Sequence, residues 1–166
     1  RRLACLPGTH SKWVVLEGDR LTGFSTFITG DLYAAIAGHT ILKHSVEPQD
    51  DAFDVAAFQT AVRTAFARPA ELSNRLFAIR AAGLLAPGEA QHPATTLSGL
   101  LIGLELAGAA SRFGLHDETS VRLVAAGPLA ERYRAAFDAL DLVAQEEDGE
   151  AAVRRGLLAA ARKILT

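Results

Sequence analysis

The sequence predicts one mixed α/β domain, in which three antiparallel strands are followed by alternating helices and strands. Residues 3–29 contain three strand-like runs separated by glycine-containing turns, and residues 96–114 have the composition of a buried helix. Residues 121–126 form a short apolar run that ends at a Gly-Pro pair. A chain of 166 residues, 49% hydrophobic and 22% charged, is long enough to bury one core.

The opening strands are separated by turn residues. The first strand is expected over residues 3–7 and the second over residues 12–17, and Gly18-Asp19 supplies a two-residue turn with the twist that a hairpin requires. Residues 20–29 then alternate between two faces with a period of two. We therefore expect three consecutive antiparallel strands.

From Asp31 the apolar spacing becomes helical. An acidic residue in the first turn stabilises the positive end of a helix dipole, so Asp31 marks the expected start. Gly38 is expected to break this helix before Ile41 and Leu42. The segment therefore predicts one short, interrupted helix.

A helical insertion is predicted at about residues 52–96. It follows a polar connector at 46–51, has helical spacing over 52–82, and closes after Gly83 with a loop at 86–96. Its amphipathic spacing is compatible with either a subunit interface or a lid over a substrate.

The apolar segment that follows is expected to be a helix capped by Ser98. Gly99 and Gly103 are four residues apart and leave a flat face, which favours close packing on the sheet over a membrane dimer seam. The apolar run at 97–110 is shorter than the ~20 residues of a membrane span, so no membrane partner is expected. Glu105 within it must reach solvent or find a partner.

The last third alternates strands and helices. After the strand at 121–126, Gly127-Pro128 begins a helix, because proline fits the first helical position. A short strand around Leu142-Val143 and a helix over 153–165 complete the chain. Three antiparallel strands followed by helix, strand, helix, strand and helix is the order of the ribonuclease-H-like fold, in which parallel strands 4 and 5 join the first three.

Composition narrows the function classes. The formal net charge is −2 with acids and bases interspersed, so nucleic acid is not an expected partner. Cys5 is the only cysteine and, like Trp13, is expected in the core. The histidines, including His39 and His44, lack zinc-binding spacing, so no metal site is predicted from them. Without a secretory apolar segment, a soluble cytoplasmic protein is expected.

The tip between the first two strands is unusually polar: Gly8, Thr9, His10, Ser11 and Lys12. Glycine lets a ligand approach the main chain, successive N–H groups in a turn can bind an anion, and an ammonium group stabilises phosphate charge. The alternative is an ordinary turn whose hydroxyl groups satisfy their own backbone. The spacing is not that of a Walker A loop.

A second candidate site lies where the apolar strand ends at Gly127. Free N–H groups and the positive end of the next helix face the carboxyl end of that strand, where ligands bind in open parallel sheets. A plain strand-to-helix turn is equally compatible with the pattern. Asp31 allows three interpretations: a helix-start acid, a ligand of metal-bound water, or a catalytic base.

Four segments together resemble the carboxyl-terminal half of the 2-dehydro-3-deoxygalactonokinase family: "LPGTHSKWV", "TGDL", "LSGLLIGLELA" and "LVAAGPLAERYRAAF". These are sugar-acid kinases of the actin-like ATPase superfamily, and the resemblance runs over residues 3–165. It implies transfer of the ATP γ-phosphate to the 6-hydroxyl of 2-dehydro-3-deoxy-D-galactonate in galactonate catabolism, with Mg²⁺. The alternatives are a non-catalytic actin-like module for nucleotide binding or assembly, and a kinase of another keto-deoxy sugar acid.

The resemblance also implies positions for the nucleotide. Near the β- and γ-phosphates it places Gly8, Thr9, His10 and Ser11, with Lys12 close by. Beside the nucleoside it places Ala126, Gly127 and Pro128. Thr29, Gly30 and Asp31 match a segment that usually carries glutamate where this chain has the shorter aspartate. The catalytic candidates are therefore Lys12 and Asp31, and no base is assigned.

Such kinases close two domains over MgATP. The amino-terminal domain carries the first phosphate loop, an acidic Mg²⁺ site and much of the sugar pocket, and it is expected to be missing here. We therefore expect this chain to be inactive alone. The expected partners are ATP, the sugar acid, the missing domain and, through the insertion, a second copy of the chain.

Overall fold

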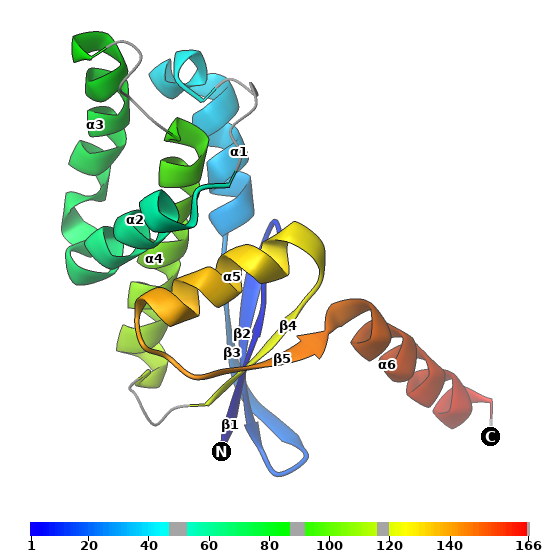
Figure 1. Cartoon of the computed structure of the whole chain (residues 1–166). Helices are drawn as coiled ribbons and strands as arrows, with labels where there is room; N and C mark the ends of the chain where they lie inside the picture. Colours follow the sequence, from blue (N-terminus) through cyan, green and yellow to red (C-terminus); the bar gives the residue numbers. More distant parts are fainter. Residues whose placement is uncertain (47–52, 87–91, 116–119, 166) are drawn as a thin grey trace.

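A five-stranded mixed sheet with order β3-β2-β1-β4-β5 organises the domain (Figure 1). The computed structural model describes residues 1–46, 53–86, 92–115 and 120–165. β1 pairs antiparallel with β2 and parallel with β4, β2 pairs antiparallel with β3, and β4 pairs parallel with β5. The strands are β1 (Arg2–Leu6), β2 (Ser11–Glu17), β3 (Arg20–Phe27), β4 (Val121–Ala125) and β5 (Ala144–Asp148).

The three opening strands are confirmed, and so is the turn between the second and third. Gly18 has a φ of +59°, the left-handed conformation that glycine adopts without steric cost. In β2, Trp13 is fully buried, as is Cys5 in β1, so both are core residues as predicted. Burial raises the pKa of the Cys5 thiol well above its usual value.

Helices lie mainly on one side of the sheet, and α2 and α4 run side by side (Figure 1). The helices are α1 (Thr29–His39), α2 (Val55–Ala67), α3 (Leu72–Leu85), α4 (Pro93–Phe113), α5 (Gly127–Ala139) and α6 (Gly149–Ile164), with short 3₁₀ turns η1 (Ile41–His44) and η2 (Pro69–Glu71). Two neighbouring apolar clusters form the core. One joins the sheet to α2, α4 and α5, and the other joins α1, η1, α2, α3 and α4.

Gly38, the predicted break in the first helix, lies inside that helix. α1 continues through Gly38 and ends at His39, so the interruption before Ile41 falls at Thr40 instead. The Thr40 backbone is extended, and its hydroxyl accepts a hydrogen bond from the Leu42 N–H. α3 ends at Leu85, two residues after Gly83, so the predicted close of that segment is confirmed to within two residues. A single glycine costs a helix only about 1 kcal/mol, which helical neighbours offset.

The start of α4 was predicted too late. The helix begins at Pro93, preceded by His92 at a φ of +57°, and Ser98 is buried inside it rather than capping it. The N–H at the first helical position has no acceptor within the helix. Proline, which lacks an N–H, therefore fits that position without loss and favours a helix start there. The last four residues of the predicted loop at 86–96 therefore belong to α4. Residues 87–91 of that loop, and most of the connector at 46–51, lie outside the described residues.

Gly99 and Gly103 do provide close packing, but against a helix. An added Cβ would lie 2.6 Å from the Phe58 carbonyl oxygen at position 99 and 2.5 Å from the Val62 carbonyl oxygen at position 103. Both oxygens belong to α2, so the prediction that the pair packs on the sheet is wrong.

The apolar stretch is also longer than the run counted in the sequence. α4 has 21 residues and contains an 18-residue stretch with a mean hydropathy of 1.3, which by length and composition alone is enough to cross a membrane. In this domain 61% of that stretch is buried, as in the core helix of a globular protein.

The last strand and helix differ from their expected setting. Leu142 is buried in the core after α5, and β5 begins two residues later than predicted, with the charged sequence AQEED. β5 is an edge strand, and its acids pair with arginines such as Arg134 and Arg122 instead of packing inward. α6 forms as predicted but contains no buried residue. Its apolar residues Val153 and Leu157 are 61% and 67% exposed.

Candidate functional site

The polar hairpin tip packs against the first turn of α1, although the two are far apart in sequence. The Asp31 N–H donates a 3.0 Å hydrogen bond to the Thr9 carbonyl. A Cβ at Gly30 would lie 2.9 Å from both the Gly8 oxygen and the Thr9 Cα, so only glycine allows this approach. The predicted segments 8–12 and 29–31 therefore form one surface.

The tip still presents unused donors. Within the described part of the chain, the main-chain N–H groups of Gly8, Thr9 and His10 donate to no acceptor, and both Thr9 and His10 are exposed. Pairing between β1 and β2 ends at Leu6 and Lys12, so Gly8, Thr9 and His10 lie outside the sheet ladder. Such a run of open N–H groups is suited to an anion.

Charged side chains surround these donors. Lys12 donates from Nζ to the His10 carbonyl at 2.7 Å, so its ammonium folds back over the tip. His10 Nε2 lies 3.7 Å from Asp31 Oδ2. The two catalytic candidates, Lys12 and Asp31, therefore both reach the tip, one from β2 and the other from α1.

Ser11 takes a different position from its neighbours. Its side chain is fully buried, and its hydroxyl lies 2.9 Å from the Tyr133 hydroxyl. It supports the tip from beneath, and its hydroxyl does not line the surface that an anion would meet.

Sequence reasoning identified Glu105 only as a residue in need of a partner, and the structure supplies three. Trp13 Nε1 donates to one carboxylate oxygen at 2.9 Å, and the Tyr133 hydroxyl donates to the other at 2.7 Å. The Thr29 hydroxyl donates to that second oxygen as well. Glu105 is 2% exposed. Burial and then the nearby Glu105 charge raise the pKa of Tyr133 well above its usual value.

A small cavity of about 110 Å³ lies between the tip and α5. Gly8, Gly30 and Leu129 line it, with Ser98 and Ile102 of α4 on its floor. Figure 1 shows the β1–β2 tip beside the lower end of α1 and the first turn of α5. The tip and α5 thus face a common space.

The second predicted site forms a separate hollow. Gly127 has a φ of +60°, and no side chain caps the first turn of α5. A cavity of about 350 Å³ at the carboxyl ends of β4 and β5 is lined by Ala126 and Gly127 and by acids of β5, including Glu147. The two cavities flank the first turn of α5 and share no lining residue.

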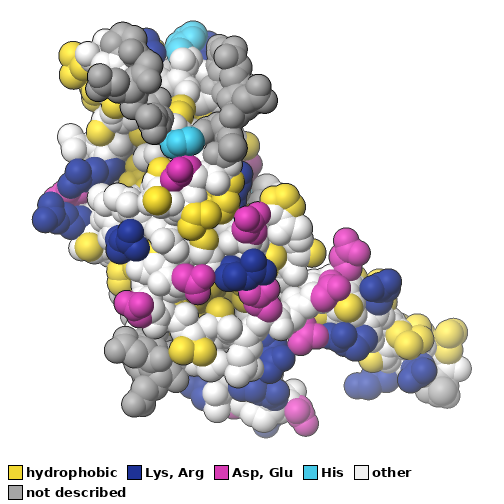
Figure 2. Space-filling view, in the orientation of Figure 1, with side chains coloured by type: hydrophobic (Ala, Val, Ile, Leu, Met, Phe, Trp, Pro, Cys, Tyr) yellow, Lys and Arg dark blue, Asp and Glu magenta, His cyan; other side chains and the backbone are white. Residues whose placement is uncertain are grey.

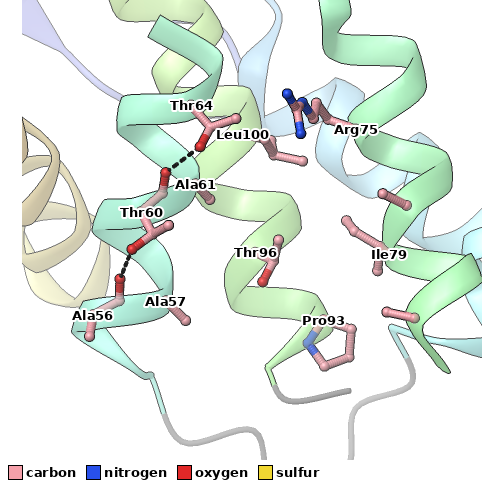
Figure 3. A pocket seen from close by; sticks show the side chains of 12 residues that line it. Ala56, Ala57, Thr60, Ala61, Thr64, Arg75, Ile79, Pro93, Thr96 and Leu100 are labelled. Atoms are coloured by element: carbon pink, nitrogen blue, oxygen red, sulfur yellow. Dashed lines mark hydrogen bonds between the residues drawn. The ribbon is translucent and has the colours of Figure 1, made fainter. Parts of the chain in front are cut away.

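The largest cavity described, about 590 Å³, lies elsewhere, between α2, α3 and α4 (Figure 3). Small side chains such as Ala57 line it, together with Arg75. The hydroxyls of Thr60 and Thr64 each donate 2.8 Å hydrogen bonds to carbonyls of their own helix. None of the residues predicted to bind nucleotide lines this cavity.

Comparison with known proteins identifies the family of this chain. The family model described as 2-keto-3-deoxy-galactonokinase matches residues 1–160. The Rhizobium meliloti protein named "Probable 2-dehydro-3-deoxygalactonokinase DgoK1" is 48% identical over 98% of this chain and 53% of its own length. The Escherichia coli 2-dehydro-3-deoxygalactonokinase is 31% identical over 98% of this chain and 54% of its own length.

A solved structure shares the fold. The crystal structure of a Sinorhizobium meliloti protein described as a 2-dehydro-3-deoxygalactonokinase superposes with a TM-score of 0.91, at 48% identity, over 98% of this chain and 54% of its own. The chain therefore spans about half the length of the relatives that it matches. It belongs to the 2-keto-3-deoxy-galactonokinase family.

Proposed function

We propose that this chain is the carboxyl-terminal, nucleotide-binding half of a sugar-acid kinase. The intact protein would transfer the γ-phosphate of ATP to the 6-hydroxyl of 2-dehydro-3-deoxy-D-galactonate. The observation that carries the proposal is the hairpin tip, with the open N–H groups of Gly8, Thr9 and His10, set against the start of α1 in a member of this kinase family.

In this proposal the tip holds the β- and γ-phosphates. Phosphoryl transfer depends mainly on positioning and on stabilising the charge of the transferred group. The three main-chain N–H groups provide fixed dipoles, and Lys12 provides a positive charge at the same loop. The hollow lined by Ala126 and Gly127 receives the nucleoside, on the far side of the first turn of α5.

This surface would hold Mg²⁺ only together with the phosphates of a bound nucleotide. Among the described residues, no three histidine, cysteine or acidic side chains lie together as a metal site. Kinase Mg²⁺ is commonly held by one or two carboxylates plus the substrate phosphates. Asp31 is the carboxylate that adjoins the tip, so it would hold the ion, or its water, with the phosphates.

The sheet order supports a ribonuclease-H-like domain of the actin-like ATPase type. Three antiparallel strands precede two parallel ones, with β1 at the centre of the sheet. The other half of the kinase, corresponding to the part of the relatives that this chain does not match, would close the cleft. We place the whole enzyme in the cytoplasm.

We also propose that the intact protein is a homodimer through the helical insertion. The outer side of α3 exposes Phe77 by 60% and Leu84 by 58%, and Leu85 at its end is 86% exposed. Light scattering coupled to size exclusion should give twice the monomer mass, and Phe77→Ser should return a monomer. A monomeric wild-type protein would remove this part of the proposal.

The test of the kinase proposal uses the intact protein and a panel of 2-keto-3-deoxy acids in an ADP-release assay. Lys12→Ala should lower kcat/KM on the preferred acid by about a hundredfold, the order expected for one preorganised charge at a transferring group. Lys43→Ala, on the exposed turn η1, is the matched control and should stay within about twofold. Equal activity of the Lys12→Ala and wild-type proteins would instead favour a non-catalytic, assembly-type role for this half of the protein. Preference for another acid would change only the substrate.

A further inference from the structure

Glu105 connects all three segments that border the candidate nucleotide site. Among the described residues it is the only buried one with a carboxylate or basic side chain. It bonds to Thr29 at the start of α1 and to Tyr133 of α5, and Tyr133 in turn bonds to Ser11 at the hairpin tip. On α4, Glu105 lies one turn beyond Ile102, and Ile102 lines the small cavity.

The chemistry of the partners fixes the direction of each hydrogen bond. An indole N–H can only donate, so Trp13 donates to Glu105. The Tyr133 hydroxyl has one proton and donates it to the Glu105 carboxylate. Ser11 must therefore be the donor in its contact with Tyr133. The Glu105 carboxylate therefore determines which group donates and which accepts in each hydrogen bond from Glu105 through Tyr133 to Ser11 at the tip.

We propose that Glu105 is a positioning residue for ATP, an inference that rests on the proposed kinase function. It holds the tip, the start of α1 and α5 at one fixed spacing, so that the N–H groups of the tip point at one place. The core alone does not require a charge here, because apolar side chains of similar size fill a core without the cost of desolvating an ion. What the carboxylate adds is a fixed donor-to-acceptor direction for the hydrogen bonds that hold the three segments.

Glu105→Gln tests this role with little change in shape. The remaining carbonyl oxygen can still accept from Trp13, but the new NH₂ then faces the hydroxyls of Thr29 and Tyr133. Both hydroxyls must turn and accept, and Ser11 must reverse as well. We expect the dissociation constant for MgATP, measured by titration calorimetry on the intact protein, to rise about tenfold, the size of one charge-assisted hydrogen bond. The KM for the sugar acid should stay within about twofold.

Two further variants separate positioning from general stability. Leu106→Ala empties space in the same core, one residue along α4, without touching the network. It should lower Tm yet leave MgATP binding within about twofold. Tyr133→Phe keeps the Glu105 carboxylate with its bonds to Trp13 and Thr29 and removes the hydroxyl that joins it to Ser11, so it should weaken MgATP binding by about threefold. It also carries the test if Glu105→Gln does not fold.

The outcomes distinguish this inference from the function on which it rests. Wild-type affinity in both Glu105→Gln and Tyr133→Phe overturns the positioning role, as does an equal loss of affinity in Leu106→Ala. An intact protein that binds MgATP but phosphorylates no sugar acid overturns the proposed function and leaves the binding comparison valid. An intact protein that does not bind MgATP overturns both.

Discussion

The contact between α2 and α4 gives the sharpest stability prediction. In Gly99→Ala the new Cβ would lie 2.6 Å from the Phe58 carbonyl oxygen and 2.8 Å from the Ala61 Cβ. Both distances are well inside van der Waals contact, and one partner is main chain. The substitution therefore requires the two helices to move apart.

The expected cost follows from two opposing effects. Overpacking a core costs typically about 1–3 kcal/mol. Replacing glycine by alanine inside a helix returns about 0.5–1 kcal/mol. The net destabilisation should be about 1–2 kcal/mol, which lowers the Tm of a domain of this size by about 2–8 °C.

Gly38→Ala is the matched control. Gly38 is exposed near the end of α1, and a Cβ there would meet nothing within 4 Å. The same chemical change should therefore raise stability by about 0.5–1 kcal/mol. Thermal unfolding of the intact protein followed by circular dichroism measures both variants. If Gly99→Ala is as stable as Gly38→Ala, α2 and α4 do not approach each other as described.

Further predictions concern the core thiol and the isolated chain. Burial raises the pKa of the Cys5 thiol in the folded state above its ordinary value of 9.0. The neutral thiol therefore contributes fully to the free energy of unfolding below pH 9, and this contribution is lost as the pH rises through the folded-state pKa. Urea unfolding from pH 7 to 10.5 should thus show a shallower decline for Cys5→Ala than for wild type, and parallel curves would contradict the buried thiol. This chain expressed alone should release no ADP above background where the intact protein does, and turnover by the isolated chain would refute the need for a second half.

The sequence was sufficient for those elements whose signals are local. Gly18-Asp19 set the β2–β3 hairpin, and Pro128 marked the start of α5, because turn and helix-start residues act over a few positions. Pro93 carried the same signal as Pro128, but the loop-like composition around it obscured the start of α4.

The errors arose where tertiary contacts decide. β5 is a charged strand that no apolar pattern announces, and it forms because it pairs with β4 and its acids meet arginines such as Arg134. The partner of the Gly99 face could not be read from α4 alone, since sheets and helices both accept a flat surface.

The candidate site was predictable in its parts but not in its connections. Gly8 to Lys12 and the segment at Gly30 were identified separately, and their direct contact depends on how α1 leaves β3. Tyr133 gave no signal beyond an apolar helix position, because its hydroxyl finds Glu105 and Ser11 only after folding. The inward orientation of Ser11 was hidden for the same reason.

The exposed apolar side of α6 has a consequence for experiments on any form of this protein. Figure 2 shows hydrophobic side chains at the outer end of this 16-residue helix, beside Lys and Arg side chains. A helix with no fully buried residue gains little stability from packing. Its amide hydrogens should therefore exchange with deuterium earlier than those of α4, and slow exchange there would report that another surface has covered it.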